Sequence, residues 1–286
     1  MTDLEITRPA LADYDEIQQL WVSAFGDSPD YVRFFLKKGD PSETGLLLRS
    51  GGRAASMLFL LPSVLRLEGR FYPCRYLYAA ATHPEFQGRG FFSLLEEEAC
   101  RLSREEGVDF IGLVPAAPSL FRFYQKFGYR IRFYQNQSLL AGGKDPGEAL
   151  RITPCSADDF LRLRWEWLQK RPVFFEFASP FDRYRYEELR YAGGEVFLAE
   201  WGEESGYFAG EMTDRAYRIR ETNLSLRLLS GIGERMRSQR GFRQITLSGG
   251  TGIGVRRPYG MLKCLNTAIP SVQYARADGL MSLMLN

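Results

Sequence analysis

A run of residues that could hold a phosphate group extends from Thr82 to Leu95. An apolar segment ends at His83-Pro84, a turn containing Gly88 and Gly90 follows, and a stretch with helical apolar spacing then begins. The first turn of a helix exposes backbone N–H groups that lack partners, and it carries the positive end of the helix dipole. The pattern therefore predicts a binding site for a phosphate or pyrophosphate.

Residue spacing also indicates the elements that must position this turn. Alternating apolar residues predict a strand near 71–82, and apolar residues on one face predict a helix near 91–106 that ends at Gly107. Elsewhere in the first half, the same periodicities predict strands near 3–8, 45–50, 54–66, 109–114 and 129–140, and helices near 11–24, 29–38 and 119–127.

The turn resembles the acetyl-CoA motif of the Gcn5-related N-acetyltransferase (GNAT) superfamily, Gln/Arg-x-x-Gly-x-Gly/Ala. Here it reads Gln87-Gly88-Arg89-Gly90-Phe91-Phe92, with Phe92 where the family usually has a small residue. Sequences with a larger residue there look like the subgroup related to the enhanced-intracellular-survival acetyltransferases, which carry two acetyltransferase-like halves. The resemblance implies an α/β (α+β) fold of two tandem GNAT-like domains, each a mixed, mostly antiparallel sheet flanked by helices.

In that family this region binds acetyl-CoA, so the resemblance implies which residues contact the cosubstrate. Backbone groups of 80–82 would pair with the pantetheine arm, and one N–H group would polarise the acetyl carbonyl. Gly88 and Gly90 leave room for the pyrophosphate, and Arg89 can donate charge-assisted hydrogen bonds to it. Close packing under a helix is an alternative reason for the small residues at 79–81. The implied contact residues are Ala80, Ala81, Thr82, Gln87, Gly88, Arg89, Gly90, Phe91, Phe92, Ser93 and Ser119.

A second segment resembles the same family. Leu120-Phe121-Arg122-Phe123-Tyr124-Gln125-Lys126-Phe127-Gly128-Tyr129 is similar to the family's Tyr-x-x-x-Gly-Phe segment, whose tyrosine protonates the departing CoA thiolate in many members. The resemblance therefore implies that Tyr124 is the general acid. A phenol with a pKa of about 10 is protonated at neutral pH and can donate to a thiolate. Simple packing is the alternative, because the chain contains 15 tyrosines.

The general base that would take a proton from an amine acceptor is not evident. No Asp or Glu lies in the strand from Arg75 to Thr82. His83 is the only histidine, but the family often has a histidine before this proline for structural reasons. A water chain, a carboxylate from the second half and the chain terminus at Asn286 stay open as alternatives.

The opening pattern of the chain recurs in its second half. An ungapped alignment with a shift of 146 positions pairs Leu4, Ile6 and Thr7 with Leu150, Ile152 and Thr153, and it pairs Trp21 with Trp167. The Gly- and Pro-containing segment at 141–149 has the composition of a linker. We therefore expect a GNAT domain with the acyl-CoA site at 1–140, a linker at 141–149, and a degenerate GNAT-like domain at 150–286.

The second half shows no copy of the phosphate motif. Aligning Gly107 with Gly241 puts the acid Glu221 opposite Gln87, so we expect one CoA site and a second half that is structural or recognises the acceptor. The glycine-rich segment 249–254 is interpreted as a loop, and the aromatic run 174–186 as interface core or acceptor pocket. The expected elements are strands near 195–201, 206–213 and 244–248 and a helix near 225–240.

The composition is that of a globular protein and limits the classes of partner. The formal net charge of +2 gives no field that would favour nucleic acid or a membrane surface, and no apolar run is long enough to cross a bilayer. Four scattered cysteines and one histidine predict neither a metal site nor a disulfide framework. We expect a cytoplasmic, metal-free N-acetyltransferase that uses acetyl-CoA and a small-molecule or peptide amine, its oligomeric state unknown. The alternatives are a CoA-binding sensor or scaffold without catalysis, and a transferase of a larger acyl or aminoacyl group.

Overall fold

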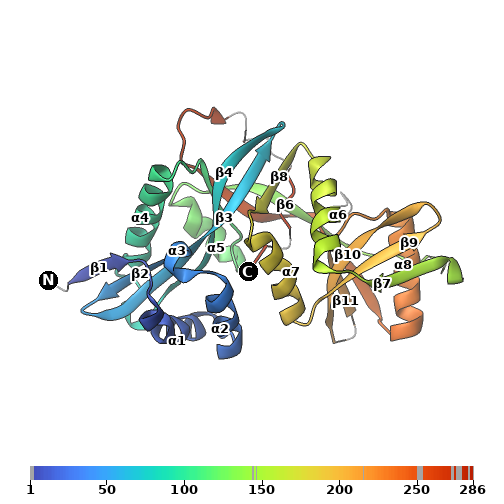
Figure 1. Cartoon of the computed structure of the whole chain (residues 1–286), viewed down its shortest axis with the longest axis horizontal. Helices are drawn as coiled ribbons and strands as arrows, with labels where there is room; N and C mark the ends of the chain where they lie inside the picture. Colours follow the sequence, from blue (N-terminus) through green and yellow to red (C-terminus); the bar gives the residue numbers. More distant parts are fainter. Residues whose placement is uncertain are drawn as a thin grey trace.

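The structure is a computed structural model (Figure 1). It describes residues 3–143, 145, 147–214, 216–249, 254–271, 274, 279–282 and 284–285. The first half contains β1 (Leu4–Thr7), α1 (Tyr14–Phe25), α2 (Pro29–Lys38), α3 (Pro41–Thr44), β2 (Gly45–Ser50), β3 (Arg53–Leu67), β4 (Arg70–Thr82), α4 (Phe91–Glu105), β5 (Phe110–Leu113), α5 (Pro118–Gln125) and β6 (Arg130–Leu139). The second half contains β7 (Leu150–Pro154), α6 (Ala157–Gln169), β8 (Val173–Phe177), α7 (Phe181–Tyr191), β9 (Glu195–Trp201), β10 (Glu204–Thr213), β11 (Ala216–Thr222), α8 (Leu226–Arg240), β12 (Gln244–Ser248) and β13 (Val255–Cys264).

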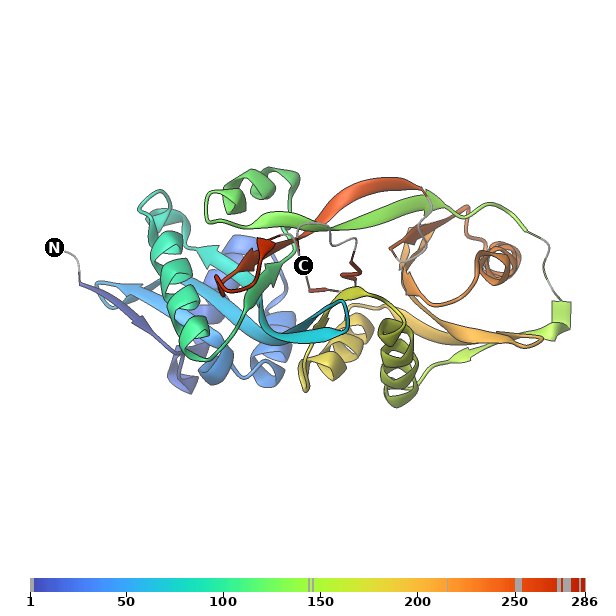
Figure 2. The ribbon, with the colours of Figure 1, turned by 90° about the horizontal axis from the view of Figure 1, so that it is seen from above.

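One sheet of 13 strands runs through both halves in the order β1-β2-β3-β4-β5-β13-β6-β12-β11-β10-β9-β7, with β8 paired to β3. Each half lends one strand to the other. β13 comes from the second half but pairs with β5, whereas β6 comes from the first half and pairs with β12. These two long strands lie side by side across the middle of the molecule in Figure 2. The halves are therefore joined by backbone hydrogen bonds as well as by side-chain packing.

Helices cover both faces of the sheet in each half. In the first half α1 and α2 pack on one face through Trp21 and Phe35, and α4 packs on the other through Leu95. In the second half α8 covers one face through Ile232, and α6 covers the other through Phe160. Their apolar stripes supply the buried contacts that make short helices stable in a protein.

The expected fold class is confirmed: the chain forms two tandem α/β units with mostly antiparallel strands flanked by helices. Among the described strands, β4–β5 and β11–β12 are parallel and the other pairings are antiparallel. The repeat is visible as well, because β1 and β7 occupy the two ends of the sheet and are followed by α1 and α6.

Four elements of the second half were missed by the sequence patterns: β8, α7, β11 and β13. Phe174, Phe175 and Phe177 of β8 are buried, and β8 pairs with β3, so this aromatic run forms core between the halves. Of the glycine-rich segment expected as a loop, 250–253 lie outside the described residues. The strand β13 begins directly after it, at Val255.

A buried ionic network fixes the second half against the last residues of the chain. Glu221 of β11 accepts hydrogen bonds from the Arg164 guanidinium at 2.7 and 3.0 Å and from Tyr207 at 2.8 Å, and it also bonds Ser282. Glu176 of β8 pairs with both Arg164 and Arg185. Glu221 thus lies inside a strand, not in a turn like Gln87, so the gap-free alignment of these two residues was wrong.

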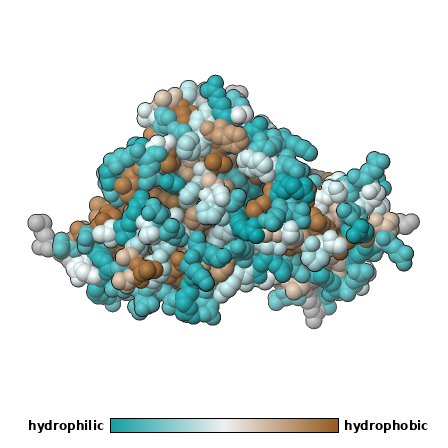
Figure 3. Space-filling model, viewed as in Figure 1, coloured by the Kyte–Doolittle hydropathy of each residue, from teal (hydrophilic) through white to brown (hydrophobic). Residues whose placement is uncertain are grey.

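The surface face seen in Figure 3 is largely hydrophilic, with smaller groups of apolar residues between. Within the described residues, no helix is long and apolar enough to cross a membrane.

Candidate functional site

Strands β4 and β5 run together only at their beginnings. They pair in parallel from Cys74–Phe110 to Tyr76–Gly112, after which β4 continues to Thr82 along β3. β5 ends at Leu113, so from residue 77 onward β4 has no strand partner on that edge among the described strands. This divergence leaves backbone hydrogen-bonding groups of β4 open to a ligand.

The open edge of β4 carries a bulge. Met57 of β3 pairs with Ala81 and Phe59 with Tyr78, so Ala79 and Ala80 together face a single residue of β3. Ala79 has a φ of 47°, a left-handed conformation that is rare for a residue with a Cβ. Bulges and strained backbone of this kind re-aim main-chain groups and gather at functional sites.

A cavity of about 240 Å³ lies where the two strands diverge, and we call it the first cavity. It is lined by Trp21, Phe25, Asp27, Tyr76, Leu77, Tyr78, Ala79, Ala80, Val114, Ala116, Leu120, Tyr124 and Leu285. The structure therefore brings the predicted residues Ala80 and Tyr124 into one cavity. Ala81 and Thr82 continue β4 beyond it, where Ala81 is buried and the Thr82 hydroxyl lies 2.8 Å from that of Ser56.

Tyr124 is buried among aromatic side chains. Its ring packs edge-on against Phe92 and Tyr129, which leaves the side chain only 9% exposed. Burial raises the pKa of Tyr124 to about 12, because a phenolate would be poorly solvated there. Desolvation is the sole cause of this shift, and no hydrogen bond or neighbouring charge of the described residues contributes to it.

The glycine turn before α4 has the shape of an anion cradle. Gly88 and Gly90 have φ values of 76° and 80°, and a Cβ built on either would meet nothing within 4 Å. Gly90 caps α4 without a side-chain hydrogen bond. Within the described residues, backbone N–H groups from 88 to 92 donate to no backbone carbonyl outside the helices and strands. Open space beside free N–H groups at a helix N-terminus fits a pyrophosphate.

The side chains around the turn are placed differently from one another. The Gln87 amide donates to the Thr82 carbonyl at 3.3 Å, which ties the turn to the end of β4. Arg89 is exposed, with its guanidinium 5.3 Å from the centre of the Phe86 ring. His83 accepts a hydrogen bond from the Glu85 N–H, which supports a structural role as helix cap over a role as general base.

Phe92 turns away from the cradle. Its ring centre lies 5.1 Å from that of Phe123 and 5.0 Å from that of Phe127, so the side chain packs under α5. Phe91 is buried in the same core, whereas Ser93 is exposed on the first turn of α4. Ser119 is exposed at the start of α5 and does not line the first cavity.

The carboxylate of Asp27 lines the first cavity, a position that the sequence patterns did not identify. The Trp21 indole donates to it at 2.8 Å, and this bond fixes the carboxylate at the end of α1. Helix α1 ends at Gly26 in a left-handed conformation, which turns the chain so that Asp27 faces back. In the sequence, only the spacing Trp21…Gly26-Asp27 could have indicated this carboxylate. That spacing becomes informative only once α1 is known to pack beside β4.

The second half offers two alternatives for the general base: the chain terminus and a carboxylate. Asn286 lies outside the described residues. Leu285 lines the first cavity, and its carbonyl accepts a hydrogen bond from the Tyr76 hydroxyl at 2.5 Å. The partly buried carboxylate of Glu188 belongs to a second cavity that shares Val114 and Ala116 with the first. No group of three or more His, Cys, Asp or Glu residues in the described chain could hold a metal ion.

Comparison with known proteins places the fold. Residues 5–132 match the family model described as an acetyltransferase (GNAT) domain. A GCN5-related N-acetyltransferase from Anabaena variabilis is similar at 17% identity and a TM-score of 0.74, over 92% of this chain and 73% of that one. Eis1 from Mycobacterium abscessus is similar at 12% identity and a TM-score of 0.64, over 93% and 74%. No curated protein matches this chain.

The tandem arrangement has a counterpart over nearly the whole of another chain. A tandem GNAT protein from the clavulanic acid biosynthesis pathway is similar at 13% identity and a TM-score of 0.55, over 92% of this chain and 99% of that one. At such identities the likeness concerns the fold alone. The expected resemblance to the GNAT superfamily and its two-halved members is confirmed at that level.

Proposed function

We propose that this chain, which carries a GNAT acetyltransferase domain over residues 5–132, transfers an acetyl group from acetyl-CoA to a primary amine. The thioester supplies an activated acetyl carbon. The amine nitrogen forms a bond to that carbon, the carbon–sulfur bond breaks, and the thiolate takes up a proton. No covalent enzyme intermediate is required, because donor and acceptor react directly.

One observation carries the proposal: Tyr124 and the bulged residues Ala79 and Ala80 line the same cavity. A GNAT domain needs an acid at the departing sulfur and N–H groups at the carbonyl oxygen. Tyr124 would donate the proton of its Oη to the sulfur, and its elevated pKa keeps that proton in place at neutral pH. N–H groups of β4 would polarise the carbonyl.

The cosubstrate would be held along one side of the first half. Gly88, Arg89, Gly90, Phe91, Phe92 and Ser93, with Gln87 tying the turn to β4, would hold the pyrophosphate at the N-terminus of α4. Ala80, Ala81 and Thr82 would offer backbone groups to the pantetheine arm. Ser119, exposed at the start of α5, would contact it from the opposite side.

Asp27 is the residue that we assign to the incoming amine. Amines arrive largely as ammonium ions, and a carboxylate that lines the reaction cavity attracts them and can receive the proton that must leave before attack. Trp21 holds Asp27 in place through the indole hydrogen bond. In this scheme the first half performs catalysis and the second half recognises the acceptor. The linker at 141–149 would separate these two domains.

The test combines binding with turnover. Acetyl-CoA at a hundred times its Kd should raise the melting temperature by roughly 5–10 °C, whereas the absence of a shift with any acyl-CoA would overturn the proposal. Tyr124→Phe should lower the amine-dependent release of CoA by roughly 10² to 10⁴-fold while it keeps that thermal shift.

Tyr217→Phe is the matched control, because it removes a buried tyrosine hydroxyl that has no hydrogen-bond partner among the described residues, in the core of the second half. Its rate should equal that of the wild type. Binding of CoA without release from any amine would instead favour a sensor or scaffold. A larger thermal shift and faster release with longer acyl-CoAs would favour transfer of a larger acyl group.

A further inference from the structure

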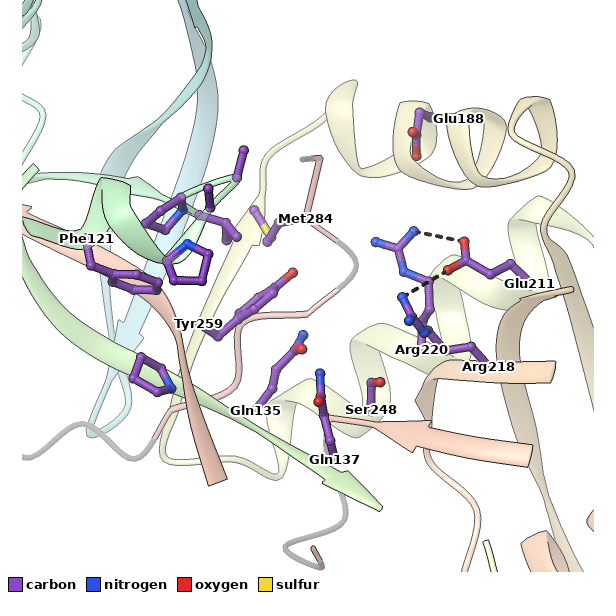
Figure 4. A pocket seen from close by; sticks show the side chains of 16 residues that line it. Phe121, Gln135, Gln137, Glu188, Glu211, Arg218, Arg220, Ser248, Tyr259 and Met284 are labelled. Carbon is purple, nitrogen blue, oxygen red and sulfur yellow. Dashed lines mark ion pairs between the residues drawn. The ribbon is translucent and has the colours of Figure 1, made fainter. Parts of the chain in front are cut away.

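The second cavity, of about 390 Å³, lies between the two halves (Figure 4). One wall is the segment that follows β5, including Val114 and Ala116, which also line the first cavity. The opposite wall comes from α7, β10 and β11 of the second half. Its volume lies in the usual range for small-molecule sites, and the shared wall makes it the neighbour of the proposed reaction centre.

Four charged side chains gather at the far end of this cavity: Glu188 from α7, Glu211 from β10, and Arg218 and Arg220 from β11. Figure 4 shows Arg220 pointing up between the two carboxylates. Glu211 is 3.7 Å from the Arg218 guanidinium and 3.6 Å from that of Arg220, distances too long for hydrogen bonds. These groups are therefore oriented by one another but keep hydrogen-bonding capacity for a ligand.

The charges of the cluster are balanced and only partly solvated. The side chains of Arg220 and Glu211 are 23% and 24% exposed. Burial raises the pKa of Glu188, and the neighbouring Arg220 and a hydrogen bond from Tyr31 oppose that rise. Two guanidinium groups beside two carboxylates cancel in formal charge. A ligand with a single charge would leave one sign unmatched, whereas a zwitterion complements both.

The middle of the cavity has an apolar side and a polar side, the latter formed by Gln135 and Gln137. Tyr259 and Met284 lie between the charged end and the wall shared with the first cavity, and Phe121 lies at the end farthest from the charged cluster. The apolar side of this path, at Tyr259 and Met284, suits an aliphatic stem, because apolar and aromatic surfaces receive methylene groups at no hydrogen-bonding cost. At the other end of the path, beyond Val114 and Ala116, lies Asp27 in the first cavity.

We propose that the second cavity is the acceptor site and takes a diamino acid: a primary amine joined by an aliphatic stem to a zwitterionic amino-acid head. Arg218 and Arg220 receive the carboxylate of the head, and Glu188 receives its α-ammonium group. The stem passes Tyr259, and the terminal amine enters the first cavity beside Asp27. This inference rests on the proposed acetyl transfer and names the acceptor class of that site.

Three acceptors with the same stem and terminal amine separate the parts of the head. L-lysine has the whole head, 6-aminohexanoate lacks the α-ammonium group, and 1,5-diaminopentane lacks the carboxylate. With acetyl-CoA as donor, kcat/KM for L-lysine should exceed that for either analogue by about tenfold or more, the value of one charge-assisted contact. The product should be acetylated on Nε, which mass spectrometry of the fragments identifies. Equal kcat/KM for all three would overturn the inference.

Two variants assign the effect to the cluster. Arg220→Gln should lower the ratio of kcat/KM for L-lysine to that for 1,5-diaminopentane by about tenfold, and Arg218→Gln, with a side chain that is 53% exposed, should act in the same direction. Glu188→Gln should lower the ratio of L-lysine to 6-aminohexanoate instead. The control is Arg151→Gln, because Arg151 pairs with Glu200 at 3.4 Å on the far edge of the sheet. It should change neither ratio.

Direct titration separates this inference from the proposed transfer. L-lysine titrated calorimetrically into the protein without acetyl-CoA should bind the wild type, and at least about tenfold more weakly Arg220→Gln. Binding of L-lysine by a protein that ignores acetyl-CoA would sustain the site and end the proposed transfer. Transfer to other amines without binding or use of L-lysine would end the inference and leave the transfer standing.

Discussion

Strands β4 and β11, which precede helices α4 and α8 of the two halves, end differently, although the strands around them are arranged alike. In each half a parallel pair diverges, β4 from β5 after Tyr76 and β11 from β12 after Ile219, and a cavity lies at each divergence. In the first half an open glycine turn of eight residues, 83–90, leads from β4 into α4. In the second half three residues, Asn223–Ser225, lead from β11 into α8.

The helix N-termini show what this difference does. The Ser225 side chain accepts a hydrogen bond from the Leu228 N–H, and the Ser225 N–H itself donates to Glu204. The N-terminus of α8 is thus satisfied by the protein's own groups, whereas that of α4 is capped by Gly90 without a side-chain bond. One architecture can therefore offer an anion site or close it, and the choice depends on a few residues between strand and helix.

The largest expected effect concerns the strand end of the second half. Glu221→Gln should lower the free energy of unfolding by about 3–5 kcal/mol, because it removes one of the two buried carboxylates that neutralise Arg164 and Arg185. Urea unfolding measures the change. Glu200→Gln, which affects an exposed pair on β9, should cost less than about 1 kcal/mol. Equal effects of the two substitutions would contradict a structural role for the network.

The same residue predicts acid sensitivity. Burial alone would raise the pKa of Glu221, but Arg164 and the hydrogen bonds of the network hold it below the ordinary value. A lowered folded-state pKa means that the stabilisation is complete above the unfolded pKa of about 4.3 and is lost as pH falls toward the folded value. Below about pH 4.3 the free energy of unfolding of Glu221→Gln should therefore decline less than that of the wild type.

The next prediction compares two pairs of glycines that have similar positive φ values. Gly88→Ala with Gly90→Ala should weaken acetyl-CoA binding by about a hundredfold, because two methyl groups would enter the open cradle. Gly202→Ala with Gly241→Ala is the control, since these glycines have φ values of 62° and 69° and equally open surroundings. Both pairs should lose similar stability from the left-handed backbone. If both pairs weakened binding alike, the cradle would not be the binding site.

A smaller effect is expected from the N-terminus of helix α8, where the Ser225 side chain accepts a hydrogen bond from the Leu228 N–H. Ser225→Ala removes the cap of α8 and should cost about 1 kcal/mol of stability without a change in the Kd of acetyl-CoA. Ser156→Ala, which removes the equivalent cap of α6, should cost about the same. Weaker acetyl-CoA binding in Ser225→Ala alone would show that α8 takes part in the site after all.

The smallest expected effect is a catalytic rate that stays constant as pH rises. Since burial raises the pKa of Tyr124 to about 12, the catalytic rate should show no decline from loss of its proton between roughly pH 7 and 10. The rate of CoA release at saturating amine and acetyl-CoA measures this profile. A decline centred near pH 10 that Tyr124→Phe abolishes would show an unperturbed phenol and contradict the burial argument.

Local patterns were sufficient for most of the first half. Strand 45–50 and helix 29–38 were predicted with the bounds that the structure has, and the turn at Gly88 and Gly90 was placed between the expected strand and helix. Apolar periodicity and glycine chemistry act within a few residues, so the sequence carries them directly. Tyr124 was likewise predicted on the short helix α5.

The strand β13 could not be predicted from such patterns. Its sequence contains Arg256, Arg257 and Pro258, which argue against a central strand, yet it pairs with β5 and β6 of the first half. Its partners lie more than a hundred residues away in sequence, and their contribution is invisible in local periodicity. The same holds for Asp27, which becomes a candidate only because α1 packs beside β4.

The sequence by itself determined the repeat, the helix N-terminus with its glycine turn, and the tyrosine that follows, because these depend on nearby residues. The tertiary structure alone decided that β4 and β5 diverge around a cavity and that the halves exchange β6 and β13. It also decided that Arg218, Arg220, Glu188 and Glu211 meet at one end of a second cavity. Those arrangements come from pairing and packing between distant segments, whose free energy depends on the whole fold.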